Sequence, residues 1–461
     1  MKLQERIDGI VVRGPRKPRG SPKNPKTKVA KKPKKLREFA SILEDYEIDF
    51  FMDMDIAVIK DLKEQIGTMK DVRDESYVWH KLEDVILITL FAVMANCDEW
   101  YQIPMFAEAH REWFETFLSL PNGIPTENTI EIIISKIDTN ELYGLVLSFL
   151  INRIENRIQK SGLTEKEDIA AEREIIALDG KASKSSKRAA TDQKEGQSAL
   201  NTLNAYSSDY GMPLTQEFIP NKKSEIEYAP KLLEKIDIQG AVVTADALNT
   251  QPKTVEAIIG GGADYVLPVK GNRSTLYGDL QAIFDEKCID DIRSNENNSG
   301  SYIKTEEREH GQIVIREYFF MPKVDGLYKP ELWKGLESIG LEHKTITKID
   351  PKTKEPTSVY EDRYYISSLN SVTDFSKAVR GHWAVEGLHW HLDYTFHDDQ
   401  NKTTAEKGAK GLQIFKKLAL NILKIAQAVS PKRISVRKLR FMLSLSYEDM
   451  MSNILGILTD L

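Results

Sequence analysis

Residues 174–181 read Glu174-Ile-Ile-Ala-Leu-Asp179-Gly-Lys181, a short apolar run that closes on an acidic residue. The same pattern returns in Gly240-Ala-Val-Val-Thr-Ala-Asp246. Apolar runs of this length, rich in β-branched residues, are typical of strands that are buried on both faces. We therefore predict two buried strands, one that stops at Asp179 and one that stops at Asp246.

The segments around these two runs predict further strands and helices in a defined order. Ser208–Gly211 is a hairpin signal between two of the strands. The additional elements are strands at 199–206, 213–219 and 264–270 and helices at 223–235 and 251–259. The resulting order, β-β-β-α-β-α-β, is that of a ribonuclease H-like core in an α/β fold. We place the first part of this core at residues 170–270.

Helical patterns flank the predicted core on both sides. Residues 38–165 repeat apolar side chains every three or four positions, which predicts an all-helical N-terminal domain. Its clearest helices are expected at Ile56–Ile66, Leu82–Met94 and Ile130–Ile137, the last capped by Thr126 or Asn128. Residues 367–461 are expected to hold the second part of the core and C-terminal helices, with helices at 373–396, 404–429 and 433–456.

Residues 271–366 interrupt the core pattern. A helix is expected at 274–285, a polar stretch follows at 290–300, and alternating strand patterns cover Tyr302–Met321 and Thr357–Leu369. We predict a β-rich insertion within the ribonuclease H-like core.

The net charge of −6 conceals an uneven distribution along the chain. Residues 1–37 hold 14 Lys and Arg against two acidic residues, a local charge of +12, so the remaining residues carry −18. Five prolines oppose a regular helix in this basic arm, and we expect it to be disordered. Two interpretations stay open: an arm that binds phosphates without sequence preference, or a solubilising tail.

Cysteine usage and hydropathy restrict the class of protein. The two cysteines, Cys97 and Cys288, lie far apart, so neither a disulfide framework nor a thiolate zinc site is expected. The longest apolar run, Val85–Ala95, is too short to span a bilayer, and no secretory signal is apparent. We expect a cytoplasmic protein that does not bind membranes.

The two strand-end aspartates form the centre of the expected site. Strands in this order lie side by side, so the carboxylates of Asp179 and Asp246 are expected to bind the same cations. Glu386 lies on the helix at 373–396, at the border of a buried stripe, from which it could reach the sheet. The stripe is formed by Val385, Leu388, Leu392 and Phe396, and the polar row beside it by His382, Glu386, His389, Asp393 and His397.

Three carboxylates suit a particular chemistry. Two Mg²⁺ ions, with Mn²⁺ as a substitute, prefer oxygen ligands and can activate an attacking oxygen and stabilise a leaving one in phosphodiester cleavage. Each residue also has a simpler interpretation. Asp179 could be a turn residue before Gly180, Asp246 a helix cap and Glu386 a solvated helix residue.

The ordered set of motifs resembles the bacterial insertion-sequence DDE transposases of the H-repeat-associated type over about residues 38–425. The shared motifs are Asp71-Val-Arg73, Leu120–Thr129 (LPNGIPTENT), Ala177–Lys181 (ALDGK), Thr244–Gln251 (TADALNTQ), Tyr265–Asn272 (YVLPVKGN) and Arg380–Asp393 (RGHWAVEGLHWHLD). This resemblance implies a DNA transposase with Asp179, Asp246 and Glu386 as its catalytic, metal-binding triad. It also implies double-stranded DNA, both terminal repeats and target, as the partner, with the helical domain as a DNA-binding domain, a homodimer on paired ends and association with the nucleoid.

Several residues near the triad are candidates for DNA contacts. The family usually has an arginine shortly after its Asp-Gly-Lys motif, where this chain offers Lys184, Lys187 and Arg188. Related transposases have an arginine four residues before the catalytic glutamate, a position that His382 holds here. The candidates are Lys181, Lys184, Lys187, Arg188, Lys270, Asn272, Arg380, His382, Trp383, His389 and Trp390. The alternative for both tryptophans is packing against the insertion, and for Lys407, Lys410, Lys416 and Lys417 a DNA-facing or a solvated helix is open.

Other functions remain open on sequence grounds. The same triad would serve a metal-dependent nuclease without strand transfer, and the fold would serve a domesticated DNA-binding regulator. Glu386-x-x-His389 also permits a di-iron site, but its only companion, Glu307–His310, lies in a strand-like run where that spacing does not put both residues on one face.

Overall fold

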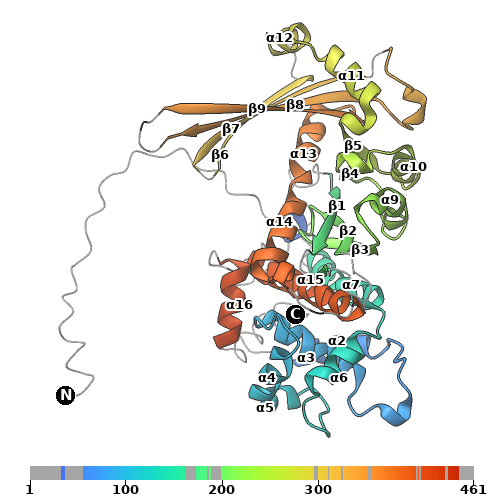
Figure 1. Cartoon of the computed structure of the whole chain (residues 1–461), viewed down its shortest axis with the longest axis vertical. Coiled ribbons are helices and arrows are strands. Elements are labelled where there is room, and N and C mark those ends of the chain that lie inside the picture. The colour runs from blue at the N-terminus through green and yellow to red at the C-terminus, as the bar shows by residue number, and fades with distance from the viewer. Residues whose placement is uncertain are drawn as a thin grey trace, which may run out of the picture.

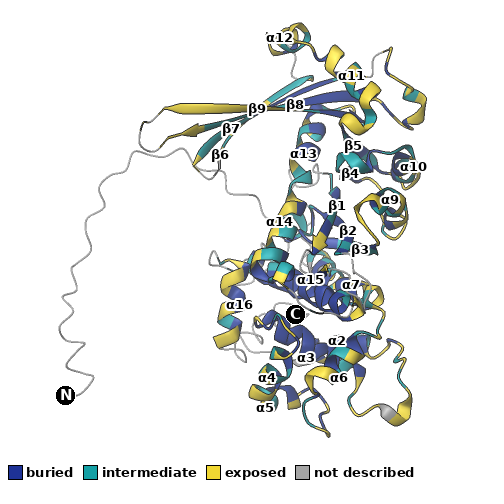
Figure 2. Ribbon diagram, in the orientation of Figure 1, coloured by how far each residue is buried: buried dark blue, intermediate teal, exposed yellow. Residues whose placement is uncertain are grey.

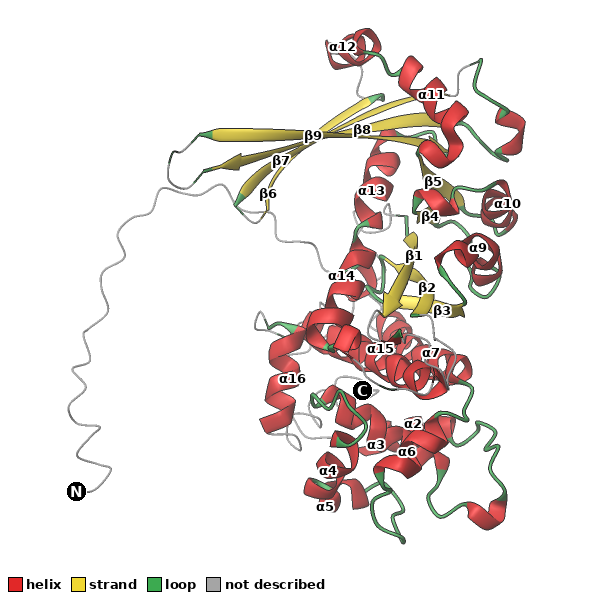
Figure 3. Cartoon of the chain, viewed as in Figure 1, coloured by secondary structure: helices red, strands yellow, loops and turns green. Residues whose placement is uncertain are grey.

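The protein is a mixed α/β molecule built around one large sheet (Figures 1 and 3). The computed structural model describes residues 33–36, 56–160, 173–183, 186–187, 199–294, 300–309, 311–322, 325–350, 353, 355–400, 403, 406–430 and 434–445. No helix in these ranges is both long enough and apolar enough to cross a membrane.

The sheet has nine strands in the order β3-β2-β1-β4-β5-β9-β8-β7-β6. Strands β1, β4 and β5 are parallel to one another, and every other neighbouring pair is antiparallel. The strands are β1 Ile175–Ser183, β2 Leu200–Ser207, β3 Pro213–Ile219, β4 Val242–Ala245, β5 Asp264–Val269, β6 Tyr302–Glu309, β7 Gln312–Pro322, β8 Ser338–Ile349 and β9 Pro356–Ser367.

The interrupting segment 271–366 adds its strands to this same sheet. Strand β9 pairs with β5, from Val266 opposite Ser367 to Val269 opposite Tyr364. The long ends of β6–β9 then project away from the helices in Figure 1. The expected strand pattern at Tyr302–Met321 is two strands, and β8 was not singled out by the sequence.

Helices cover the two faces of the sheet in different ways. On one face, α9 (Glu225–Leu233), α10 (Pro252–Gly260) and α11 (Ser274–Ile283) share an apolar core with β1, β4 and β5. On the other face, α13 (Val372–His382) packs through Phe375 and Val379 against Val242 and Tyr365. The short helix α12 (Glu286–Ser294) follows α11.

The N-terminal helices share one core with the C-terminal helices. Helix α15 (Glu406–Val429) packs against α3, α6 and α7, and the buried residues of this region form one continuous cluster, dark blue in Figure 2. The remaining helices here are α2 Ile56–Ile66, α3 Leu82–Met94, α4 Gln102–Ala109, α5 Arg111–Glu115, α6 Glu127–Ile134, α7 Thr139–Lys160 and α16 Val436–Leu445. The bounds predicted for α2 and α3 are confirmed, and Thr126 caps α6 by accepting from the Thr129 amide.

Two predicted boundaries are wrong. Strand β1 does not stop at Asp179 but continues to Ser183, because β2 pairs with it along that length. The single helix expected at 373–396 is interrupted at Trp383. It consists of α13, then α14 (Ala384–Trp390), then a π-helical turn at His391–Thr395.

Candidate active site

Asp179 and Asp246 occupy equivalent positions on adjacent parallel strands. The pairing of β1 with β4 ends with Leu178 beside Ala245, so the two aspartates are the next residues on each strand. Paired strands lie about 4.8 Å apart. The sheet therefore brings the two carboxylates together, as the sequence predicted, even though β1 runs on past Asp179.

These carboxylates repel one another in a partly buried setting. Burial, the charge of Asp246 and the charge of Glu225 raise the pKa of Asp179 to about 7, partly offset by the Gly180 amide. The side chain of Asp246 accepts hydrogen bonds from the Asn249 backbone amide at 3.1 Å and from Asn249 Nδ2 at 2.9 Å. Asp246 thus caps the short helix η5 (Ala247–Asn249), so the helix-cap interpretation is confirmed and leaves its second oxygen for other partners.

Helices α13 and α14 cross the sheet at these strand ends. His382, the last residue of α13, contacts Thr244 on β4 through Nδ1, 3.1 Å from Oγ1. One segment later, His389 Nδ1 lies 3.5 Å from Asp179 Oδ2. Burial lowers the pKa of both imidazoles to about 4, so both are neutral at pH 7.

Glu386 lies about one helical turn before His389, but it lines a surface pocket, whereas His389 lies beside Asp179. Its side chain is exposed in an open pocket of about 410 Å³ between α13, α14 and the projecting strands β6–β9, called the extended sheet below. The pocket is also lined by Arg316, Lys344, Arg380, Trp383 and Trp390. Among the described residues, no three His, Cys, Asp or Glu side chains converge on one metal position, so Glu386 does not join the two aspartates in this arrangement.

Asp393, which belongs to the same polar row as Glu386, forms an ion pair with Lys181. The Lys181 ammonium donates to Asp393 and lies 3.8 Å from both Asp398 and Asp399, and the residue is 7% exposed. Lys181 is therefore neutralised inside the protein, and the expected phosphate contact does not fit its position. The interaction instead ties the π-helical turn to β1.

A buried polar network continues beneath Lys181 into α15. Lys417 is fully buried and donates to Asn204 Oδ1 at 2.7 Å and to Gln216, while burial lowers its pKa to about 7. Lys416 is equally buried and lies 3.9 Å from Asp398. Neither the DNA-facing nor the solvated interpretation of these two lysines is correct.

The other candidate DNA contacts divide by exposure. Trp390 is 51% exposed and stacks on Tyr394, whereas Trp383 lies under Arg363, 4.3 Å from its ring, and beside Lys344 of the extended sheet. Lys187 and Lys270 are exposed, and Asn272 donates to the carbonyl of Ala247, next to Asp246, at 2.6 Å. Lys184 and Arg188 lie outside the described residues.

Glu225 was not predicted from the sequence, but in the structure it is the third carboxylate that interacts with Asp179 and Asp246. It is 2% exposed, although it occupies the first turn of α9, where glutamates are usually solvated. No pattern in the sequence distinguishes it from its neighbour Glu227.

The chain matches two known protein families. The family described as Transposase DDE domain matches residues 170–422, and the family described as DDE_Tnp_1-associated matches residues 63–150. The chain belongs to the bacterial DDE transposases of the H-repeat-associated type. The first match includes Asp179, Asp246 and Glu386, and the second lies within the helical N-terminal region.

Individual relatives agree with this membership. The candidate transposase YncI of Escherichia coli O157:H7 is 32% identical over 369 residues, covering 79% of this chain and 88% of its own. The candidate H repeat-associated transposase YhhI of Escherichia coli K12 is 29% identical over 369 residues, covering 79% and 90%. A solved piggyBac transposase synaptic complex with hairpin DNA matches 91% of this chain and 80% of its own at 12% identity, but its TM-score of 0.37 is too low to support any inference.

Proposed function

We propose that this protein is a DNA transposase that cleaves phosphodiester bonds at the ends of a mobile element and joins those ends to target DNA. The observation that carries the proposal is the placement of Asp179 and Asp246 at equivalent positions on adjacent parallel strands, in a chain of this family. The order β3-β2-β1-β4-β5 agrees with the ribonuclease H-like core expected from the sequence.

Divalent metal ions fit the two aspartates. Their oxygens are the ligand type that Mg²⁺ and Mn²⁺ prefer. The pKa of Asp179 is raised first by burial and then by the negative charge of Asp246, and a cation would compensate that charge. We assign Asp179 and Asp246 as residues that would hold two such ions, and the family match makes Glu386 the candidate for the third ligand, although its side chain faces the neighbouring pocket in this structure. Bound there, the ions would supply Lewis-acid stabilisation of the attacking and leaving oxygens.

The residues around the carboxylates would bind and orient DNA. Lys344 and Arg380 offer cations for phosphates beside Glu386, and the exposed ring of Trp390 offers a surface on which a base can stack. Asn272 donates to the carbonyl of Ala247, next to Asp246, so Asn272 and the nearby Lys270 could contact the backbone of the same DNA. The neutral imidazole of His389 beside Asp179 leaves that carboxylate without a competing positive charge.

Two alternatives use the same structure. A nuclease would cut without joining, and a regulator would bind DNA without cutting. One relative, YbfQ of Escherichia coli K12, 35% identical over 78 residues that cover 17% of this chain and 93% of its own, is named an inactive transposase, so loss of activity occurs among similar proteins.

One assay separates the three functions. Purified full-length protein is incubated with Mg²⁺, a donor plasmid that carries the element's terminal repeats and a target plasmid. Joined products support the transposase, whereas cuts without joining indicate a nuclease and bound but intact DNA indicates a regulator. Analytical ultracentrifugation of the protein with terminal-repeat DNA tests the homodimer that joining two ends requires.

A further inference from the structure

Glu225 is a buried carboxylate that no lysine or arginine of the described residues contacts in an ion pair, although the charge of nearby Lys222 partly offsets its raised pKa. It is 2% exposed, and no Lys, Arg or His of the described ranges forms an ion pair with it. A buried ionisable group in this state costs free energy unless it is hydrogen-bonded or has a role that retains it. Its surroundings indicate such a role.

The glycine of the Asp179-Gly180-Lys181 motif makes room for Glu225. A Cβ added at Gly180 would lie 2.1 Å from Glu225 Oε1 and 2.6 Å from its carboxyl carbon. Side chains alternate along a strand, so Gly180 faces the same side of β1 as Leu178, which is the side covered by α9. The carboxylate of Glu225 therefore rests on the backbone of β1 directly beside Asp179, from the opposite face of the sheet.

A single amide links Glu225 to Asp246. Asn249 is fully buried, and its Nδ2 donates to Glu225 Oε2 at 3.0 Å and to Asp246 Oδ1 at 2.9 Å. Both protons of the Asn249 amide are thus used, one by each carboxylate. The Oδ1 atom of Asn249 has no hydrogen-bond partner among the described residues, so Glu225 is the acceptor besides Asp246 itself that holds this amide in place.

We propose that Glu225 is a positioning residue of the active site, which orients Asp246 through the amide of Asn249. This inference rests on the proposed function, because it concerns the metal affinity of the Asp179–Asp246 pair. Partners of this kind hold metal-binding side chains in a fixed geometry, and their loss commonly weakens metal affinity by about 10- to 100-fold.

The test measures Mn²⁺ binding to full-length variants by electron paramagnetic resonance, with the Mg²⁺ dependence of cleavage as a second readout. Glu225→Ala and Asn249→Ala should each weaken Mn²⁺ binding by about tenfold, and the double variant should be no weaker than either. Glu225→Gln keeps an oxygen that can accept from Asn249, so it should stay within about threefold of the parent protein.

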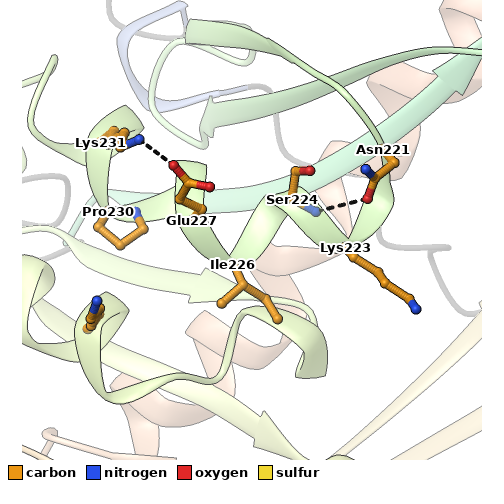
Figure 4. A pocket seen from close by; sticks show the side chains of 8 residues that line it. Asn221, Lys223, Ser224, Ile226, Glu227, Pro230 and Lys231 are labelled. Carbon is orange, nitrogen blue, oxygen red and sulfur yellow. Dashed lines mark hydrogen bonds and ion pairs between the residues drawn. The ribbon is translucent and has the colours of Figure 1, made fainter.

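A second variant tests the position of Glu225 without changing any carboxylate. Gly180→Ala should displace the end of the flexible Glu225 side chain and weaken Mn²⁺ binding as Glu225→Ala does. In a chain that already carries Glu225→Ala, the added methyl group should have no further effect. The matched control is Glu227→Ala, since Glu227 is exposed on the same helix and forms an ion pair with Lys231 (Figure 4).

The outcomes separate this inference from the proposed function. If the parent protein binds Mn²⁺, Asp246→Asn abolishes that binding and Glu225→Ala matches Glu227→Ala, the positioning role is wrong and the metal site stands. Equal losses in Glu225→Gln and Glu225→Ala would also overturn it, because they would show that charge and not orientation is what matters. If the parent protein binds no Mn²⁺ and cuts no DNA, the proposed function fails and this inference fails with it.

Discussion

Asp179 within β1, Asp246 directly after β4 and Glu225 on α9 bring three carboxylates together. Asp179, Asp246 and Glu225 interact without a lysine or arginine paired to any of them in the described residues, whereas the neighbouring Asp393 is paired with Lys181. Proteins that keep like charges together in a buried place usually do so for a function. The contrast favours the Asp179–Asp246 pair over Asp393 as the place where cations bind.

Loss of a metal-binding carboxylate should abolish cleavage and leave DNA binding nearly unchanged. Asp179→Asn, Asp246→Asn and Glu386→Gln each replace a charged oxygen with a neutral group of the same size, so the DNA-binding surface is retained. Cleavage of a terminal-repeat substrate and gel-shift affinity for the same DNA measure the two effects. Near-normal cleavage by any one variant would remove that residue from the triad. The test is most critical for Glu386, because its side chain does not join the two aspartates in the described structure.

Replacement of Asp179 should also change how stability depends on pH. The pKa of Asp179 is about 7 in the folded chain and about 3.9 when unfolded, so between these values the native state binds the extra proton and its stability falls as pH rises. Asp179→Asn lacks this loss, so in metal-free buffer its stability relative to the parent protein should increase from pH 4 to pH 7, by up to about 4 kcal/mol.

Urea denaturation of both proteins at pH 5 and pH 7.5 measures this difference. Contributions from other shifted groups, such as Glu174, occur in both proteins and cancel. Adding Mn²⁺ at pH 7.5 should reduce the advantage of the variant, since the cation stabilises the ionised carboxylate. The same stability difference at both pH values would show that Asp179 titrates normally.

At the scale of elements, the sequence predicted most strands and helices that position the site but not the break within its key helix. The apolar runs before Asp179 and Asp246 and the stripe Val385–Leu388–Leu392–Phe396 were sufficient, because each is buried and periodic. The break at Trp383 has no local signal such as proline. It follows from packing, since α13 is held by the extended sheet and α14 by the helical core.

The buried lysines mark a second limit of sequence reasoning. For Lys416 and Lys417 the sequence allows either a DNA-facing or a solvated helix, because lysine is rarely buried without a partner. Their partners, Asp398, Asn204 and Gln216, come from a loop and two strands that lie close to α15 only in the folded chain. Glu225 is likewise unremarkable in the sequence, because its contact with Asn249 forms only in the folded chain.

The two tryptophans of the site should respond differently to truncation. Trp390→Ala should weaken binding to terminal-repeat DNA, by about 1–3 kcal/mol if its ring stacks on one base, with little change in melting temperature because the ring is half exposed. Trp383→Ala should instead lower the melting temperature, since its ring contacts Arg363 and Lys344 of the extended sheet. Gel shifts measure the DNA affinity of both variants and thermal melts measure their stability. Tyr328→Ala is the control, since the Tyr328 ring is exposed. Unchanged DNA affinity in Trp390→Ala would contradict the stacking role.

At the scale of the whole molecule, segments that are far apart in the sequence meet within the described structure. Helix α15 completes the core of the N-terminal helices, and residues 33–36 lie against the hairpin between β2 and β3. Leu36 is 1% exposed, the Lys35 amide donates to the Asp209 carbonyl at 2.9 Å, and Pro33 sits against Gly211. The last residues of the basic segment 1–37 are therefore part of the folded structure, while residues 1–32 lie outside the described ranges.

This division makes the role of the basic arm testable without damage to the fold. Deletion of residues 1–32 removes 11 Lys and Arg and only two acidic residues. If the arm binds phosphates, the deletion should weaken DNA binding and flatten the log–log dependence of affinity on salt by about 0.9 for each lost contact. Deletion of residues 1–37 should flatten it similarly but also lower stability, since burial of Leu36 contributes about 1.5–3 kcal/mol.

Fluorescence anisotropy with a labelled DNA duplex, from 50 to 300 mM KCl, measures the slope, and thermal melts follow the fold. Leu36→Ala in the complete chain is the matched control, because it should lower the melting temperature and leave the slope unchanged. A slope that stays the same after deletion of residues 1–32 would show that the arm does not touch DNA, which leaves the solubilising tail as the remaining interpretation.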